Sequence, residues 1–405
     1  MMKKSLTIVF IFTVLACSAN ADPINLLTQS KLDPELQPFL PAPRTQKPVQ
    51  RVLILGFDGF TFNVLDPMIK QKSLPHFQKI ITQGTRISLS STAFPSSAAA
   101  WPAIVTGCDS HENGLQSFFL LDPRTYQLKL TNAAFRQRQA IWELASRLGK
   151  RSIVVNVPMS YPPDDIDGIM ISGLLSPPQG QFTWPTTLSP VLRRLGYQTG
   201  YRLFRESMGF GEQPLSSPAR HYDLNDVFDI TMNQCNVSLH LLDKIDWDFA
   251  MVVFTLPDRV QHNQHQLGKS MVYHTYRQMD TLLSAFLNKV PPQTSVLVIS
   301  DHGFRLYNKL FYLVPWLIQH GFLVLENGRP DWKRSKLLPI DRVGCYATLR
   351  WNVKGREASG ILDSNETKAS SKLFKHLKSQ LQQLNKDVGS PVFHELSVLT
   401  PAESG

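Results

Sequence analysis

Short apolar runs recur along this chain and give the first indication of its fold. Residues 51–59 (RVLILGFDG), 152–158 (SIVVNVP), 249–258 (FAMVVFTLPD) and 295–303 (SVLVISDHG) each contain consecutive apolar residues rather than an alternating pattern. Runs of this kind are typical of strands buried on both faces, as in a parallel sheet. We therefore predict that these segments are central strands of one sheet.

Helical patterns come before three of these runs. The helical pattern of residues 140–150 (AIWELASRLGK) precedes the run 152–158, and a helical stretch that ends near Leu242 precedes the run 249–258. The third helical pattern, residues 276–290 (YRQMDTLLSAFLNKV), precedes the run 295–303. Strands that alternate with helices indicate a sheet covered on both faces. The predicted fold class is α/β, with a doubly wound, mostly parallel sheet sandwiched by helices.

Irregular, proline-rich segments separate these elements. Residues 22–50 are predicted to be an extended leader, and the region of about 160–250 is predicted to hold a cap or insert beside the sheet. Residues 346–357 predict a strand and a turn, and residues 370–386 an amphipathic helix. We assign the whole of 51–395 to one domain.

The start of the chain has the pattern of an export signal. Two lysines precede an apolar stretch at residues 6–16, which is too short to span a bilayer, and residues 19–21 (ANA) fit a cleavage site before Asp22. No comparable apolar segment follows. We predict that residues 1–21 are a signal peptide and that the protein is exported, to the periplasm or the medium, without a transmembrane anchor.

Cysteine usage leaves one alternative for this signal and excludes two classes of protein. Cys17 keeps open a lipoprotein signal, although Leu15 suits that processing poorly. Cys108, Cys235 and Cys345 lie far apart in the sequence, which fits neither a zinc finger nor a disulfide framework. At most one disulfide bond is expected.

The charge of the chain permits an anionic ligand without identifying it. The formal net charge is +10, and the basic residues are spread along the chain without a dense run until the segment 368–378. A basic surface attracts anions such as phosphate esters. We expect a small phosphate-ester substrate and no specific binding of nucleic-acid duplexes.

Three of the predicted strands end in an aspartate, namely Asp58, Asp258 and Asp301. Because the carboxyl ends of parallel strands meet at one edge of a sheet, these carboxylates are expected to converge. His302 follows Asp301 directly, and His262 lies four residues after Asp258, on the same face of a helix that begins there.

Carboxylates combined with imidazoles suit zinc or manganese better than calcium. Each residue alone has an ordinary structural interpretation, since an aspartate at a strand end commonly caps a helix or a turn. The set as a whole points to metal. Two metal ions about 4 Å apart can hold the attacking and leaving oxygens of a phosphoryl transfer.

Residues 92–107 (TAFPSSAAAWPAIVTG) are unusual in combining small residues with several hydroxyls. The stretch lacks the branched residues of a strand, and Pro95 and Pro102 bracket a run that is short for a helix. Small side chains here would let the backbone pass close to a ligand.

In this order, GFDG (56–59), a hydroxyl residue ahead of Thr106-Gly107, D-x-x-x-H (258–262) and S-D-H-G (300–303) resemble the alkaline phosphatase superfamily. The similarity is to the type I phosphodiesterase / nucleotide pyrophosphatase family and extends over about residues 51–360. It implies an alkaline phosphatase-like fold. It also implies a metal-dependent hydrolase of phosphodiester or pyrophosphate bonds that works through a phosphoseryl intermediate.

The resemblance also implies two divalent metal ions, with Zn²⁺ expected and Mn²⁺ as the alternative. One ion would be held by Asp58, Asp301 and His302, with the oxygen of the nucleophile as a further ligand. The second would be held by Asp258 and His262.

The nucleophile of the family lies ten residues before the glycine of Thr-Gly, which is Ser97 in this sequence. Ser97 is thus expected to be both the catalytic residue and a metal ligand. Ser96 and Thr92 remain competitors for the role.

The sequence departs from the family near its end, where the second metal normally takes another histidine. His394, His265 and His320 are the candidates, and none lies in a recognisable version of the motif. Either an unusual ligand completes the second site or the site is weak. A phosphomonoesterase of the same superfamily and a non-catalytic binding protein therefore remain alternatives, whereas SSAAAW lacks the C/S-x-P-x-R pattern of a sulfatase.

Overall fold

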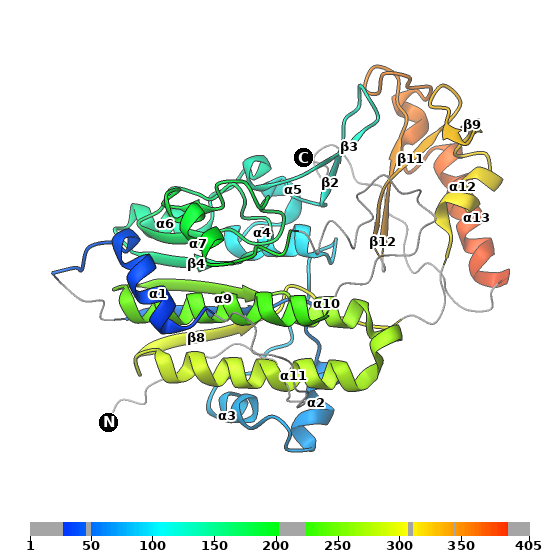
Figure 1. Ribbon diagram of the computed structural model, residues 1–405. Helices are drawn as coiled ribbons and strands as arrows, with labels where there is room; N and C mark the ends of the chain where they lie inside the picture. Colours follow the sequence, from blue (N-terminus) through cyan, green and yellow to red (C-terminus); the bar gives the residue numbers. More distant parts are fainter. Residues whose placement is uncertain (1–26, 46–49, 202–223, 307–310, 344–345, 388–405) are drawn as a thin grey trace. The chain divides into compact units, whose positions relative to one another are not determined.

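In the computed structural model the chain forms two compact units (Figure 1). The first unit comprises Met1–Leu115 and Asn132–Phe304, and the second Gln116–Thr131 and Arg305–Gly405. The structure describes residues 27–45, 50–201, 224–306, 311–343 and 346–387.

A six-stranded sheet forms the centre of the first unit, in the order β6-β5-β4-β7-β1-β8. Its strands are β1 (Arg51–Phe57), β4 (Ser152–Val155), β5 (Gly168–Ile171), β6 (Thr183–Trp184), β7 (Phe249–Phe254) and β8 (Thr294–Ile299). All neighbours pair in parallel except β5 and β6, which are antiparallel. The predicted α/β fold with a mostly parallel sheet is confirmed. β1, β4 and β7 fall within the apolar runs that indicated it, and β8 begins one residue before its run.

Helices cover both faces of this sheet. This cover is needed because strands such as β1 carry apolar side chains on both faces. Leu53, Leu55 and Phe57 belong to one core cluster, and Ile54 belongs to another on the opposite face. The first cluster is closed by α2 (Phe62–Lys70), α3 (Pro75–Gln83), α7 (Leu188–Arg194), α9 (Leu224–Lys244), α10 (Leu256–His262) and α11 (Gln264–Lys289). The second is closed by α4 (Ser97–Thr106) and residues around α6 (Ile141–Arg147).

Part of the proline-rich leader is helical rather than extended, contrary to the prediction. The helix α1 (Gln29–Leu36) contains Pro34 and buries Leu32 and Leu36 in the large core cluster. The spacing of these leucines places them on one helical face, and burial of that face outweighs the proline. Helix α1 contacts α7 and α9.

The region of about 160–250, assigned from sequence to an insert, contributes β5 and β6 to the sheet itself and most of α9 to its cover. Residues 202–223 lie outside the described part of the chain. The described cysteines, Cys108 and Cys235, are free thiols.

The unusual stretch 92–107 ends in a helix, α4, which also differs from expectation. Pro95 lies before the helix begins, so it interrupts no helical hydrogen bond. Pro102 lies inside, but three consecutive alanines favour helix, and Trp101 and Val105 are buried against the sheet. Gly107 ends the helix in the left-handed region, at φ 66°.

The described residues of the second unit form short hairpins, two α-helices and a 3-10 helix at Ser364–Thr367. Its elements are β2 (Phe119–Leu121), β3 (Leu128–Leu130), α12 (Leu313–Gln319), β9 (Leu325–Glu326), β10 (Arg329–Pro330), β11 (Leu337–Val343), β12 (Tyr346–Trp351) and α13 (Lys372–Asp387). The strand predicted within 346–357 and the helix predicted over 370–386 are thus confirmed as β12 and α13. Across the described residues of both units, every helix is too short or too polar to span a bilayer.

Candidate active site

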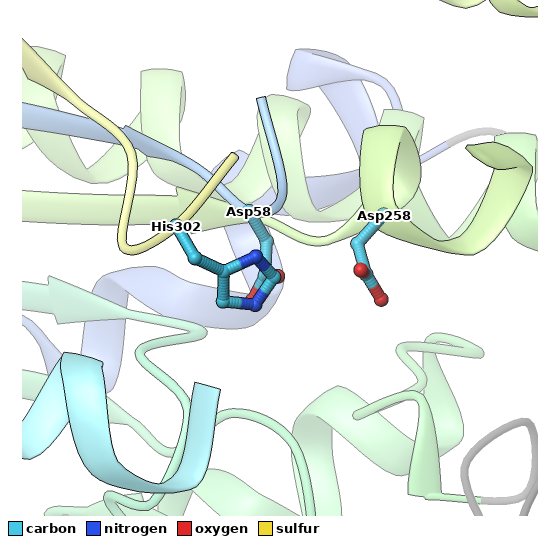
Figure 2. Close-up of side chains that lie close together, drawn as sticks. All are labelled: Asp58, Asp258 and His302. Carbon is cyan, nitrogen blue, oxygen red and sulfur yellow. The ribbon is translucent and has the colours of Figure 1, made fainter. Parts of the chain in front are cut away.

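Three neighbouring parallel strands, β7, β1 and β8, direct their carboxyl ends to one edge of the sheet. Asp58 follows β1 directly, Asp258 lies in the first turn of α10 after β7, and His302 follows β8. One ligand atom of each lies within 4.8 Å of the other two. Figure 2 shows these three side chains facing a common space, with Asp258 supplied by a separate helix.

The ring of His302 is oriented for ligation. Its Nδ1–H donates to the Gly303 carbonyl at 2.9 Å, so in the neutral ring the lone pair is on Nε2. Nε2 lies 3.2 Å from Asp301 Oδ2 and 3.8 Å from Asp58 Oδ1. A hydrogen bond on the far ring nitrogen is the usual support of a metal-binding histidine.

The carboxylate of Asp301 is completely buried and only half satisfied. The backbone N–H of Gly59 donates to Oδ1 at 3.2 Å, whereas Oδ2 has no hydrogen-bond partner within the described parts of the chain. The Asp301 carbonyl accepts a hydrogen bond from Ser91 Oγ at 2.7 Å, which fixes the turn after β8. A buried carboxylate oxygen without a donor is costly unless a cation or proton occupies the space beside it.

Asp258 and His262 form a second pair on α10. Their Oδ1 and Nε2 atoms lie 3.2 Å apart, as the four-residue spacing predicts. The side chain of His262 is 56% exposed and that of Asp258 12%, so the pair lies where the buried cluster reaches the surface.

Ser97 is the first residue of α4, and its hydroxyl meets the buried cluster. Ser97 Oγ lies 3.2 Å from Asp58 Oδ1 and 3.4 Å from His302 Nε2. The two competing hydroxyls behave differently: Thr92 Oγ1 donates to the Phe94 carbonyl, and Ser96 Oγ is buried with no hydrogen-bond partner in the described structure.

Sequence reasoning did not single out one side chain of this site, that of Trp101. The indole N–H of Trp101 donates to Asp58 Oδ2 at 2.9 Å. Trp101 lies four residues after Ser97, a spacing that puts both on one face of a helix. That signal becomes visible only once the stretch is known to be helical.

The cluster carries more negative charge than its own residues compensate. Burial, and then the charges of Asp301 and Asp258, raise the pKa of Asp58 well above its usual value. Burial also raises the pKa of Asp301. The imidazole of His302 is desolvated, which opposes protonation, but Asp301 and Asp58 outweigh this and raise its pKa to about 9.

Asp258 and His262 compensate each other instead. Burial acts to raise the pKa of Asp258, but the charge and hydrogen bond of His262 outweigh it and lower that pKa. Asp258 in turn raises the pKa of His262. Without a metal the site therefore favours bound protons, which a divalent cation would displace.

These residues fit a divalent cation. With zinc–ligand bonds of 2.0–2.2 Å, two ligands of a tetrahedral ion lie about 3.4 Å apart. The separations of His302 Nε2 from Asp301, Ser97 and Asp58 are 3.2, 3.4 and 3.8 Å, close to that edge length. The donor set of carboxylate, imidazole and hydroxyl suits Zn²⁺ or Mn²⁺.

The three candidate histidines do not identify a further ligand for the second metal ion. His394 lies outside the described residues, as does the side chain of His265, whose backbone belongs to α11. His320, at the end of α12 in the second unit, donates from Nδ1 to the Trp316 carbonyl at 2.9 Å and stacks on the Trp316 ring.

Comparison with known proteins places the chain among phosphoester-cleaving enzymes. Residues 52–395 match the family "type I phosphodiesterase / nucleotide pyrophosphatase". No curated protein sequence matches the chain.

Two solved structures illustrate its structural similarities. Phosphonoacetate hydrolase from Sinorhizobium meliloti 1021, in complex with phosphonoformate, aligns with a TM-score of 0.53 and 16% identity, over 87% of this chain and 80% of the hydrolase. Murine ectonucleotide pyrophosphatase / phosphodiesterase 5, an inactive form in complex with AMP, aligns at 0.47 and 14% identity, over 76% and 67% of the respective chains. At this identity the first alignment shows a shared fold.

Proposed function

Because this chain belongs to the type I phosphodiesterase / nucleotide pyrophosphatase family and is thus a phosphoester hydrolase, we propose that it cleaves phosphodiester or pyrophosphate bonds by metal-dependent chemistry, with Ser97 as nucleophile. The observation that carries this proposal is the position of Ser97 Oγ, within 3.4 Å of both Asp58 and His302. The hydroxyl thus lies where a base and a cation would both act on it.

Two ligand sets would hold the metal ions. Asp58, Asp301 and His302 would hold one, with Ser97 Oγ beside it, and Asp258 and His262 would contribute to the second. When bound, such ions lower the pKa of a neighbouring hydroxyl and neutralise charge on phosphate oxygens.

The residues of the chain account for the remaining steps. The hydroxyl proton of Ser97 points to Asp58 Oδ1, its acceptor at 3.2 Å. Ser97 Oγ forms a bond to phosphorus as the bond from phosphorus to the leaving oxygen breaks, which gives a phosphoseryl intermediate. Water then cleaves the bond between Oγ and phosphorus and restores the hydroxyl. Since Ser97 begins α4, the positive end of that helix lies beside the transferred phosphate.

The proposal includes export, from the signal-like pattern of residues 1–21. Cell fractionation with an antibody to the protein tests this directly. Activity in the periplasm or medium is expected, and retention of the full-length chain in the cytoplasm would contradict it.

Substitution of Ser97 by alanine tests the catalytic assignment. Ser97→Ala should lower hydrolysis of bis-p-nitrophenyl phosphate at least about 1,000-fold, because loss of a nucleophile leaves only binding and electrostatic terms. Bound Zn²⁺ or Mn²⁺, measured by elemental analysis, should persist. The neighbouring Ser96→Ala is the matched control and should retain activity, since its hydroxyl is buried and makes no hydrogen bond to another described residue.

The outcomes separate the alternatives. Full activity of Ser97→Ala would remove the nucleophile assignment. Faster turnover of p-nitrophenyl phosphate than of the diester, in the wild type, would establish a phosphomonoesterase. A folded wild type that neither binds metal nor turns over either ester would be a binding protein.

A further inference from the structure

The carboxylate of Asp58 is held by two side chains of the same helix. Trp101 Nε1–H donates to Oδ2 at 2.9 Å, and Ser97 Oγ donates to Oδ1 at 3.2 Å. Both donors are on α4, one helical turn apart, so they present a fixed pair of groups to one carboxylate. The two oxygens of Asp58 are therefore not equivalent.

The indole reaches this place because β1 leaves room for it. Gly56 lies two residues before Asp58, and a Cβ atom added there would lie 2.4 Å from Trp101 Cη2. Contacts of that length do not occur in folded proteins. The indole can therefore occupy this position only because residue 56 is a glycine. Trp101 is 0% exposed and packs in the cluster that contains Ile54 and Val105.

We infer that Trp101 is a positioning residue, which orients the Asp58 carboxylate and leaves Oδ1 as the oxygen available to a cation and to Ser97. Carboxylates bind metals through one oxygen or through both, and a buried donor on one oxygen selects between these modes. The inference rests on the metal site of the proposed function. It adds that the geometry of this site depends on an indole that contacts neither substrate nor metal.

The chain offers a matched control for this tryptophan. Trp142 is also 0% exposed, belongs to the same core cluster, and donates from its indole N–H to the carboxylate of Asp164 at 2.7 Å. Asp164 is not one of the proposed metal ligands. Trp→Phe at either position thus removes a comparable indole–carboxylate hydrogen bond and a comparable volume from one cluster.

The test measures metal affinity by competition with a chromophoric chelator, with Zn²⁺ or Mn²⁺ and no substrate. Trp101→Phe should bind the metal about 10–100-fold more weakly than the wild type, the usual effect of removing the support of a ligand. Trp142→Phe should bind within about twofold of the wild type. Equal affinities of Trp101→Phe and the wild type would overturn the inference. A wild type that binds neither metal would instead refute the proposed function.

A measurement on the unmodified protein covers the case in which Trp101→Phe does not fold. In a spectrum of ¹⁵N-labelled indoles, assigned from single Trp→Phe variants at the other positions, the Trp101 N–H resonance should shift on metal addition and the Trp142 resonance should not. A Trp101 resonance that is unchanged at metal saturation would contradict the inference.

Discussion

At the amino edge of the central sheet, where the strands begin, a buried carboxylate and a half-exposed one are paired with cations. Asp248, which precedes β7, contacts Arg44 and Lys150 and accepts the backbone N–H of Arg151 at 2.9 Å. Asp167, which precedes β5, contacts Arg44 and the Arg151 guanidinium, at 3.0 and 2.9 Å. Asp248 and Asp167 thus have two cationic partners each.

At the carboxyl edge the balance is reversed. Asp58, Asp258 and Asp301 are as deeply buried as Asp248, yet their ion-pair partners among the described residues are His262 and His302 alone. Three carboxylates thus face two imidazoles. The difference shows how a charged cluster that stabilises the fold can be told from one prepared for a ligand: the first is neutralised by arginine and lysine, whereas the second leaves negative charge for an incoming cation.

The largest effect is expected from Asp301→Asn, which keeps the shape of the side chain and removes its charge. Loss of this ligand should lower hydrolysis about 1,000-fold, since a bound metal contributes several kcal/mol to the transition state. The metal-free variant should nevertheless be more stable than the metal-free wild type, because an uncompensated buried charge is gone. Urea unfolding in the presence of a chelator measures the free energy of unfolding of both metal-free proteins. A less stable metal-free variant would show that the carboxyl edge holds no excess charge.

The converse is expected at the amino edge. Asp248→Asn breaks a neutralised cluster and leaves Arg44 without its principal partner, so the free energy of unfolding should fall by about 2 kcal/mol. Turnover at saturating metal should stay within about twofold of the wild type. Equal unfolding midpoints of variant and wild type would mean that these ion pairs do not stabilise the fold.

The smallest effect is expected in the pH dependence of the metal-free chain. Burial raises the pKa of Asp301, so its destabilising effect disappears as the pH falls through that raised value, above the unfolded pKa of about 3.9. Burial opposes ionisation of Asp248 too, but the Arg151 N–H and Arg44 outweigh it and lower the pKa of Asp248. Its stabilising effect is therefore complete above about pH 3.9 and is lost only as the pH falls through the lowered value.

Urea titrations of both variants and the wild type between pH 8 and pH 3 separate these two windows. On acidification, the difference in free energy of unfolding between Asp301→Asn and the wild type should narrow first. The corresponding difference between Asp248→Asn and the wild type should narrow only near pH 3. If both gaps narrow over the same pH range, the two edges do not differ as described.

The placement of the carboxylates was predictable from sequence because parallel strands leave little freedom. Once 51–59, 249–258 and 295–303 are parallel neighbours, their acidic ends must share an edge. The four-residue spacing of Asp258 and His262 likewise determines their contact on a helix.

The helices α1 and α4 were not predictable, because local signals opposed them. In both, prolines argue against helix, whereas the deciding contribution is the burial of side chains such as Leu32 and Trp101 in a core formed by distant segments. The role of Trp101 was hidden for the same reason. Its hydrogen bond to Asp58 depends on a tertiary contact between α4 and β1, and the spacing of residues in the sequence does not reveal such a contact.

Helix α1 also limits how the protein can be shortened for laboratory use. Leu27, Leu32 and Leu36 fill apolar sites on the large cluster, and the Leu27 N–H bonds Asn233 of α9 at 3.0 Å. A recombinant chain started at the family boundary, residue 52, would expose those sites to water and invite aggregation during expression. Trimming at Asp22, in contrast, would preserve every one of these leucines and should give soluble material.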